Sequence, residues 1–132
     1  MQTSFSFSNP LLYIFVLVQM HLYTGLFITA HDAMHGTVAP KHAKINFAIG
    51  QTATLFYALF PLKKLNKKHH LHHQFVHSDQ DPDYHNGHFF AWYFQFIKQY
   101  ITWWQVVAMA IIYNVLKLWI PEQNLFLFWV LP

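Results

Sequence analysis

The sequence predicts an all-α protein whose helices cross or enter a lipid bilayer. Hydrophobic residues make up 55% of its 132 residues and aromatic residues 20%, whereas charged residues make up only 10%, far below the ~25% typical of soluble domains. A water-soluble chain with so few charges would expose large apolar patches. Long apolar runs alternate with short polar segments, and the length suits one domain over residues 1–132.

The basic charge comes entirely from lysine, since the chain contains no arginine. Nucleic-acid recognition usually relies on arginine for paired contacts to bases and phosphates, so we expect no nucleic-acid partner. Lysines beside apolar runs instead favour contact with membrane lipids on the cytoplasmic side. The chain also lacks cysteine, which excludes disulfides, thiolate catalysis and thiolate metal sites.

The first apolar run, Leu11–Ala30, follows Pro10 and has the ~20 residues that a membrane-spanning helix needs. Its polar residues Gln19 and His21 are expected to face protein rather than lipid. Because the helix should continue directly into His31, we do not expect this run to be cleaved as a signal peptide.

A turn at Gly36–Lys44 leads into a second apolar run, Ile45–Leu62. This run is slightly short for a full span, which favours a tilted or membrane-dipping helix. The two runs together predict an apolar hairpin whose ends, near His35 and near Lys63, lie on the same membrane face. The return of the chain would bring the polar segments at both ends together.

The remaining segments continue the membrane pattern. Four lysines in residues 63–68 predict a headgroup anchor on the cytoplasmic face. Ser78–Gly87 predicts an acidic turn, and the aromatic segment His88–Tyr100 an interfacial helix. Ile101–Ile120 is a third long apolar run, and Leu125–Pro132 begins a fourth. Because this last run is too short to span a bilayer, we expect the sequence to be part of a longer protein.

Histidines are concentrated in the segment KKHHLHHQFVHSD, residues 67–79. A helix here would project His69, His72 and His73 together and turn His70 aside. Neutral imidazole is the commonest transition-metal ligand. Three imidazoles on one face could therefore supply about half of the first coordination shell of a paired-metal centre.

A second histidine pair, His31 and His35, has the i, i+4 spacing of a helix face. Imidazole ligands without thiolates suit iron, copper or zinc. A zinc protease would need a general-base glutamate, and the only glutamate is Glu122. Two histidine groups around one centre instead suit two iron ions that activate O2.

Three stretches resemble the β-carotene ketolases of the membrane fatty acid desaturase/hydroxylase superfamily: TGLFITAHDAMHGTVAP (24–40), KHHLHHQFVHSDQDPDYHNG (68–87) and the segment around YITWWQ (100–105). The resemblance covers nearly the whole chain. It implies a polytopic membrane protein with two non-haem iron ions on the cytoplasmic face, O2 as oxidant and an external electron donor such as ferredoxin. It also implies a carotenoid substrate, ketolated by two hydroxylations at one allylic ring carbon and loss of water.

The resemblance also implies roles for individual residues. The iron ligands it implies are His31, His35, His69, His72, His73 and His85. The groups it implies as orienting those ligands are Asp32, Asp81 and Asp83, although turn formation or capping would equally explain the last two. The histidines outside the motif, expected at the surface or in structural positions, are His42, His70, His77 and His88.

The family has a third histidine box, HxxHH, downstream of these segments, and the 132 residues do not include it. We therefore expect the ligand set to be incomplete and the domain to be incomplete at its C-terminus, so that this piece alone would be inactive. The rival functions are a fatty acid desaturase, a carotenoid hydroxylase, a histidine-rich membrane metal-binding module and an inactive remnant.

Overall fold

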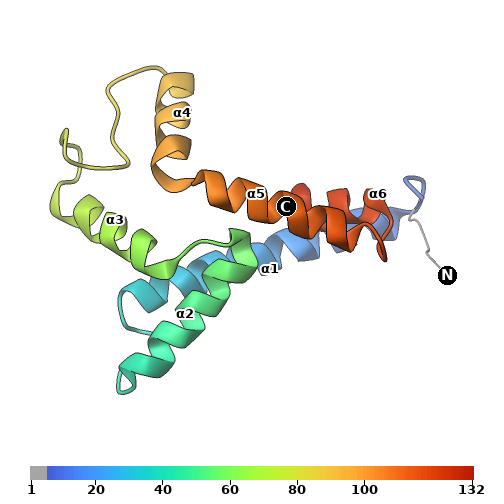
Figure 1. Cartoon of the computed structure of the whole chain (residues 1–132), viewed down its shortest axis with the longest axis horizontal. Helices are drawn as coiled ribbons and strands as arrows, with labels where there is room; N and C mark the ends of the chain where they lie inside the picture. Colours follow the sequence, from blue (N-terminus) through green and yellow to red (C-terminus); the bar gives the residue numbers. More distant parts are fainter. Residues whose placement is uncertain (1–5) are drawn as a thin grey trace.

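The computed structural model describes residues 6–132, which form only helices joined by turns (Figure 1). The all-α prediction is confirmed over this range. In chain order the helices are α1 (Pro10–Met34), α2 (Ala43–Ala58), α3 (Leu62–Gln74), α4 (Phe89–Tyr100), α5 (Trp103–Leu116), α6 (Glu122–Leu125) and the π-helix η1 (Phe126–Val130).

Helix α1 begins where the sequence predicts. Pro10 occupies the first turn, where its missing N–H costs no hydrogen bond, and the side chain of Asn9 accepts the N–H of Leu11 at 3.0 Å. The helix runs without a break to Met34, and His35 caps its end. The prediction that the first apolar run leads directly into the histidine pair is confirmed.

Helix α1 is also long and apolar enough to cross a membrane, and its most apolar window is only 6% buried within the structure. Helices α2 and α3 pass the same test only if counted as one span bent by 97°. Helix α5 is apolar but has 14 residues, fewer than the ~20 of a full span. The predicted long run Ile101–Ile120 is thus a shorter helix in the structure.

Helix α2 packs tightly against the end of α1 at Gly50. A β-carbon added there would lie 2.4 Å from Ala33 Cβ and 2.9 Å from Leu62 Cδ2. The Asn46 side chain fixes the same crossing, because its Nδ2 donates to the Ala33 carbonyl at 2.8 Å and its Oδ1 accepts the N–H of Ala39 at 3.2 Å. Backbones can approach this closely only where side chains are small.

The second apolar run does not continue to Leu62 as one helix. Leu59 adopts a left-handed conformation with φ of 55° and ends α2. The Gln51 side chain bridges the bend, since Nε2 donates to the Phe60 carbonyl at 3.2 Å and Oε1 accepts the N–H of Leu62 at 3.1 Å. The bend turns α3 back toward the end of α1 (Figure 1).

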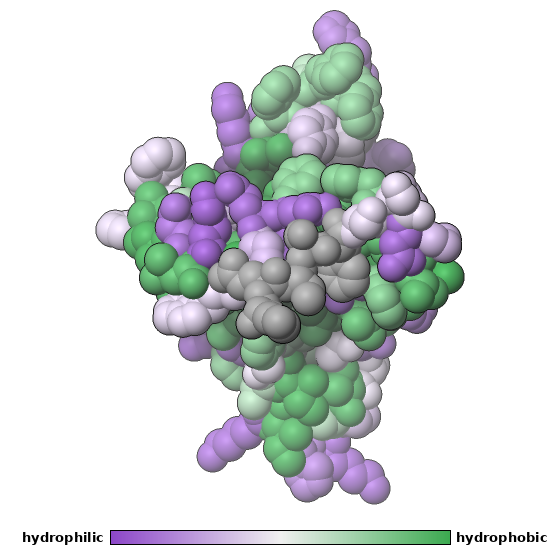
Figure 2. Space-filling view, turned by 90° about the vertical axis from the view of Figure 1, so that its right-hand side faces the viewer, coloured by the Kyte–Doolittle hydropathy of each residue, from purple (hydrophilic) through white to green (hydrophobic). Residues whose placement is uncertain are grey.

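The C-terminal helices lie over the N-terminal half of α1 (Figure 1). Thr102 caps α5 reciprocally with Gln105, whose Nε2 donates to the Ala58 carbonyl at 3.1 Å and so joins α5 to the end of α2. Figure 2 shows the molecule from the right-hand side of Figure 1. Much of its surface is apolar in this view, and long hydrophilic side chains project at the lower tip, where α1 turns into α2.

Replacing Gly50 with alanine should destabilise the protein, because the new methyl group would overlap Ala33 at the α1–α2 crossing. Overpacking of this kind costs about 1–3 kcal/mol. The matched control is Gly25→Ala, since a β-carbon at Gly25 meets nothing within 4 Å and alanine is the better helix former by about 0.5–1 kcal/mol. Thermal unfolding of both variants in detergent measures the difference, and equal midpoints would contradict the close packing.

Candidate metal centre

Four histidines from two helices converge at one point. His31 and His35 come from the end of α1, and His69 and His73 from α3. One ring nitrogen from each of the four lies within 4.8 Å of the others. Nε2 of His69 lies 2.8 Å from Nε2 of His35 and 3.1 Å from Nε2 of His73. The predicted meeting of the two histidine groups is confirmed in the geometry.

The local sequence explains this convergence. Each pair is spaced i, i+4, so its two side chains leave one face of a helix. The rings pack edge to face, with centroids 4.8 Å apart for His31 and His35 and 4.5 Å apart for His69 and His73. The bend between α2 and α3 then sets the second pair against the first.

The environment keeps one imidazole neutral. Burial, together with the neighbouring imidazoles of His31, His73 and His35, lowers the pKa of His69 to about 4. A histidine must be deprotonated to bind a metal ion. His69 is therefore in the ligand form at neutral pH.

The donor set fits a transition-metal ion. Two nitrogens bound to one ion at about 2.1 Å and at right angles lie about 3.0 Å apart, close to the 2.8 and 3.1 Å separations around His69. Nitrogen donors without thiolate suit iron, copper or zinc. Residues 31, 35, 69 and 73 could thus hold one ion between α1 and α3.

A second group of candidate ligands lies beside the first. Nδ1 of His72 is 2.9 Å from Asp81 Oδ1 and 3.5 Å from Asp83 Oδ2. The expectation that His72 would project with His69 and His73 is met only in part. Its ring packs edge to face against His73, with centroids 5.8 Å apart, but its Nδ1 turns toward the aspartates of the 75–88 loop. Since Asp81 engages Nδ1, the other ring nitrogen of His72 is the one suited to a metal ion.

Asp81 is buried and organises the loop around itself. Its Oδ1 accepts the N–H of Asp83 at 2.9 Å, and its Oδ2 accepts the N–H of His77 at 3.1 Å. Burial raises the pKa of Asp81, but the hydrogen bonds from the Asp83 N–H, the His72 ring and the His77 N–H outweigh it and leave the pKa below its usual value. The same carboxylate raises the pKa of His72. This one side chain therefore both forms the turn and fixes the His72 ring.

The other predicted residues are not members of these two groups. Oδ1 of Asp32 lies 3.4 Å from Nδ1 of His31, the position of an orienting group. Nδ1 of His85 is buried without a hydrogen-bond partner among the described residues. His77 adopts a left-handed φ of 61° in the loop, and His70 is exposed on α3, in keeping with structural and surface positions.

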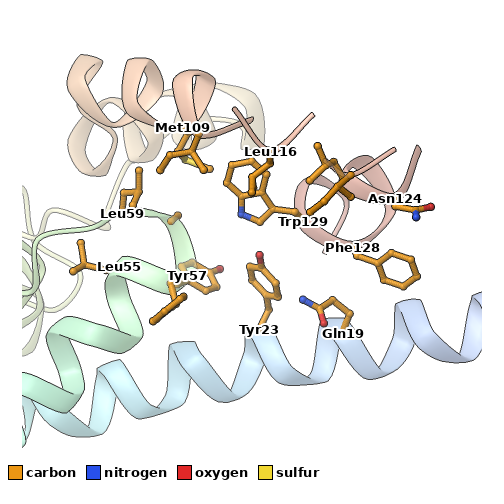
Figure 3. A pocket seen from close by; sticks show the side chains of 15 residues that line it. Gln19, Tyr23, Leu55, Tyr57, Leu59, Met109, Leu116, Asn124, Phe128 and Trp129 are labelled. Carbon is orange, nitrogen blue, oxygen red and sulfur yellow. The ribbon is translucent and has the colours of Figure 1, made fainter. Parts of the chain in front are cut away.

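Two apolar cavities follow α1 away from the histidines. The smaller, about 300 Å³, reaches His31 and His69 and is also lined by Phe27 and Tyr57. The larger, about 650 Å³, lies among α1, α2, α5 and η1, where Tyr23 and Tyr57 point into it (Figure 3). Tyr57 belongs to both linings, so the cavities adjoin at its ring.

One face of α1 lines both cavities. Gln19 and Tyr23 border the larger and Phe27 and His31 the smaller, each four residues after the last. With a rise of 1.5 Å per residue, this row is about 18 Å long. An elongated apolar ligand could therefore lie along α1 with one end at the histidines.

The sequence interpretation missed several residues that build the site. Asn46 and Gln51 anchor the crossing and the bend, and a polar side chain inside an apolar helix was the signal available for both. Tyr100, whose hydroxyl donates to Asp83 Oδ1, lies in both the aromatic segment 88–100 and the YITWWQ stretch, but neither pattern predicts a role for it at the site. Nothing in the local sequence distinguishes Tyr100 from its neighbours.

Comparison with known proteins gives consistent matches. The fatty acid desaturase family profile matches residues 8–132. A beta-carotene ketolase of Paracoccus sp. (strain PC1) is 38% identical over 127 residues, which are 95% of this chain and 52% of that protein. A beta-carotene 4-ketolase of Protosiphon botryoides is 46% identical over 92 residues, 67% of this chain and 24% of that protein. A zeaxanthin 4-ketolase of Chlamydomonas reinhardtii is 43% identical over 100 residues, 74% of this chain and 22% of that protein.

The chain spans about half the length of the Paracoccus ketolase. No solved structure matches it.

Replacing His69 with alanine should abolish metal binding at the four-histidine group, because His69 makes the two shortest nitrogen–nitrogen approaches there. We expect cobalt(II) affinity to fall at least 100-fold, measured by the visible absorption of the bound ion. The matched control is His70→Ala, which removes the adjacent exposed imidazole on the same helix and should leave the titration unchanged. Equal losses in both variants would contradict the assigned centre.

Proposed function

This chain belongs to the fatty acid desaturase family, and we propose that the whole protein is a membrane-bound non-haem diiron oxygenase that introduces keto groups into the rings of β-carotene or a related carotenoid. The single observation that carries the proposal is the convergence of His31, His35, His69 and His73 on one point. The ketolase relatives support the choice of substrate. The proposal concerns the whole protein, because the chain spans about half of the Paracoccus relative.

The ligands in this chain divide between two positions. The four converging histidines would hold one iron ion, and His72 and His85 would contribute to the second. When bound, the iron would supply the activation of O2 for attack on a strong C–H bond. The donor chemistry supports iron, since nitrogen ligands predominate and thiolates are absent from the sequence.

Three aspartates would orient the ligands. Asp32 faces Nδ1 of His31, and Asp81 and Asp83 both face Nδ1 of His72. A carboxylate on one ring nitrogen fixes the tautomer and directs the other nitrogen to the metal. The buried, hydrogen-bonded state of Asp81 supports this role.

The adjoining cavities support a long apolar substrate. A ring entering the smaller cavity would lie against His31 and His69, and the attached chain would run past Tyr57 into the larger one. The linings are strongly apolar, which suits a hydrocarbon. Two hydroxylations of one allylic ring methylene, followed by loss of water, would give the ketone.

The reaction needs reducing equivalents from outside the chain. Each hydroxylation takes up one O2, two electrons and two protons and releases one water, so an electron-donor protein such as ferredoxin would be the partner. The whole protein would be polytopic, with its histidines on the cytoplasmic face. The lysines of residues 63–68 support this orientation, because they follow the apolar hairpin directly and suit anionic headgroups.

Expression of the full-length protein in a bacterial host that accumulates β-carotene tests the proposal. We expect ketocarotenoids, recognised by chromatography and a red-shifted absorption, and at least a 100-fold loss of product in His35→Ala because His35 closes the four-histidine group. His70→Ala is the control and should retain ketolation.

Other products would point to other functions. Hydroxylated pigment alone would indicate a carotenoid hydroxylase, and new double bonds in acyl lipids alone would indicate a desaturase. Metal binding without O2 consumption would indicate a metal-binding module. Each of these results would overturn the ketolase proposal.

A further inference from the structure

Three aromatic residues form a row along one face of α4. Trp92, Phe96 and Tyr100 are spaced four apart, with ring centroids 5.5 Å apart for the first pair and 4.6 Å for the second. All three are partly buried, whereas Phe90 and Phe94 on the same helix are exposed at 70% and 62%. The helix expected at the membrane interface thus has a second face that packs against the protein.

Both ends of this row bond to one residue of the 75–88 loop. Trp92 Nε1 donates to the Asp83 carbonyl at 2.8 Å, and the Tyr100 hydroxyl donates to Asp83 Oδ1. Burial, followed by the hydrogen bond to the Asp83 carboxylate, raises the pKa of Tyr100 well above its ordinary value. The hydroxyl therefore keeps its proton and remains a donor at every physiological pH.

Asp83 passes this restraint to His72 by two routes. The carboxylate oxygen that does not bond Tyr100, Oδ2, lies 3.5 Å from Nδ1 of His72. Its backbone N–H donates to Oδ1 of Asp81 at 2.9 Å, and the same Oδ1 bonds Nδ1 of His72 at 2.9 Å. A change in the position of Asp83 would therefore move both carboxylates that face the imidazole.

The end of α4 is also held against the same face of α3 that carries His72. Lys68 lies four residues before His72, and its Nζ donates to both the side-chain and backbone oxygens of Gln99. The same ammonium lies 4.8 Å from the centre of the Tyr100 ring, within cation–π range. Tyr100 is thus fixed by its ring to α3 and by its hydroxyl to the loop.

We propose that Tyr100 is a positioning residue of the metal centre, which holds Asp83 so that His72 directs its second ring nitrogen to a metal ion. This inference rests on the proposed function, since it requires a metal ion beside His72. It goes further because it assigns a role to α4, a helix that contributes no ligand. It also separates two metal positions, since the four-histidine group lies outside the Tyr100–Asp83–His72 chain.

Cobalt(II) titration of the full-length protein tests the proposal. Tyr100→Phe keeps the ring beside Lys68 and removes only the hydroxyl. Loss of such outer contacts lowers metal affinity by 10–100-fold, so we expect the weaker of two cobalt sites to lose about tenfold in affinity and the stronger site to be unchanged. The control is Tyr113→Phe, which removes a hydroxyl bonded to Glu122 at 3.0 Å on α5 and should change neither site.

The coupling can be checked with a double variant. If Tyr100 acts through the carboxylate of Asp83, Tyr100→Phe should have no added effect on the second site in an Asp83→Asn background. Thermal unfolding of each variant checks that the fold is retained. Should Tyr100→Phe fail to fold, site-specific 3-fluorotyrosine at position 100 offers the second measurement, since its more acidic hydroxyl should shift the absorption of the second cobalt ion only.

The outcomes separate this proposal from the function itself. Two cobalt sites in the unaltered protein with unchanged affinities in Tyr100→Phe, or additive losses in the double variant, would overturn the role of Tyr100 and leave the oxygenase proposal intact. Failure of the unaltered protein to bind any cobalt would overturn both. Selective weakening of one site would support both.

Discussion

The close approach of α1 and α2 at Gly50 is the constraint on which the arrangement of the histidines depends. Because Gly50 has no side chain, α2 crosses directly over Ala33, and Leu62 at the start of α3 packs at the same point. The first residue of α3 therefore lies at the same crossing as the end of α1. From there His69 reaches His35. A larger residue at the crossing would move α3 as a unit and separate the imidazoles.

Much of the fold could be predicted from apolar run lengths and turn residues, because an apolar run favours a helix and Gly and Pro interrupt it. The bend at Leu59 could not, since a left-handed leucine has no local sequence signature and depends on the Gln51 bridge. Helix α5 is also shorter than the apolar run Ile101–Ile120 from which it was predicted. Thr102 caps its start, and the residue before Pro121 is disfavoured in helical conformation.

The candidate site likewise has parts that the sequence predicts and parts that it does not. Spacing of i, i+4 correctly predicted the pairs that converge, because about 40° around the helix axis separates such residues. His72 lies about 60° from His69 on the opposite side, which is why its Nδ1 meets the aspartates, while its ring still contacts that of His73. The hydrogen bonds centred on Asp81 depend on contacts across a loop and have no periodic signal. The ligand roles of all six histidines stay predictions: His31, His35, His69, His72, His73 and His85.

The unbroken course of α1 has a consequence for how such a protein can change its selectivity. One face of α1 contributes to the lining of both cavities and carries the imidazole of His31, so in the proposed oxygenase it would set the distance between the far end of a bound substrate and the atom to be oxidised. Inserting one residue after Tyr23 would rotate the two portions by about 100°. In the proposed oxygenase, exchanging side chains along α1 would therefore alter the choice of reacting carbon and keep this alignment, whereas a change in helix length would break it.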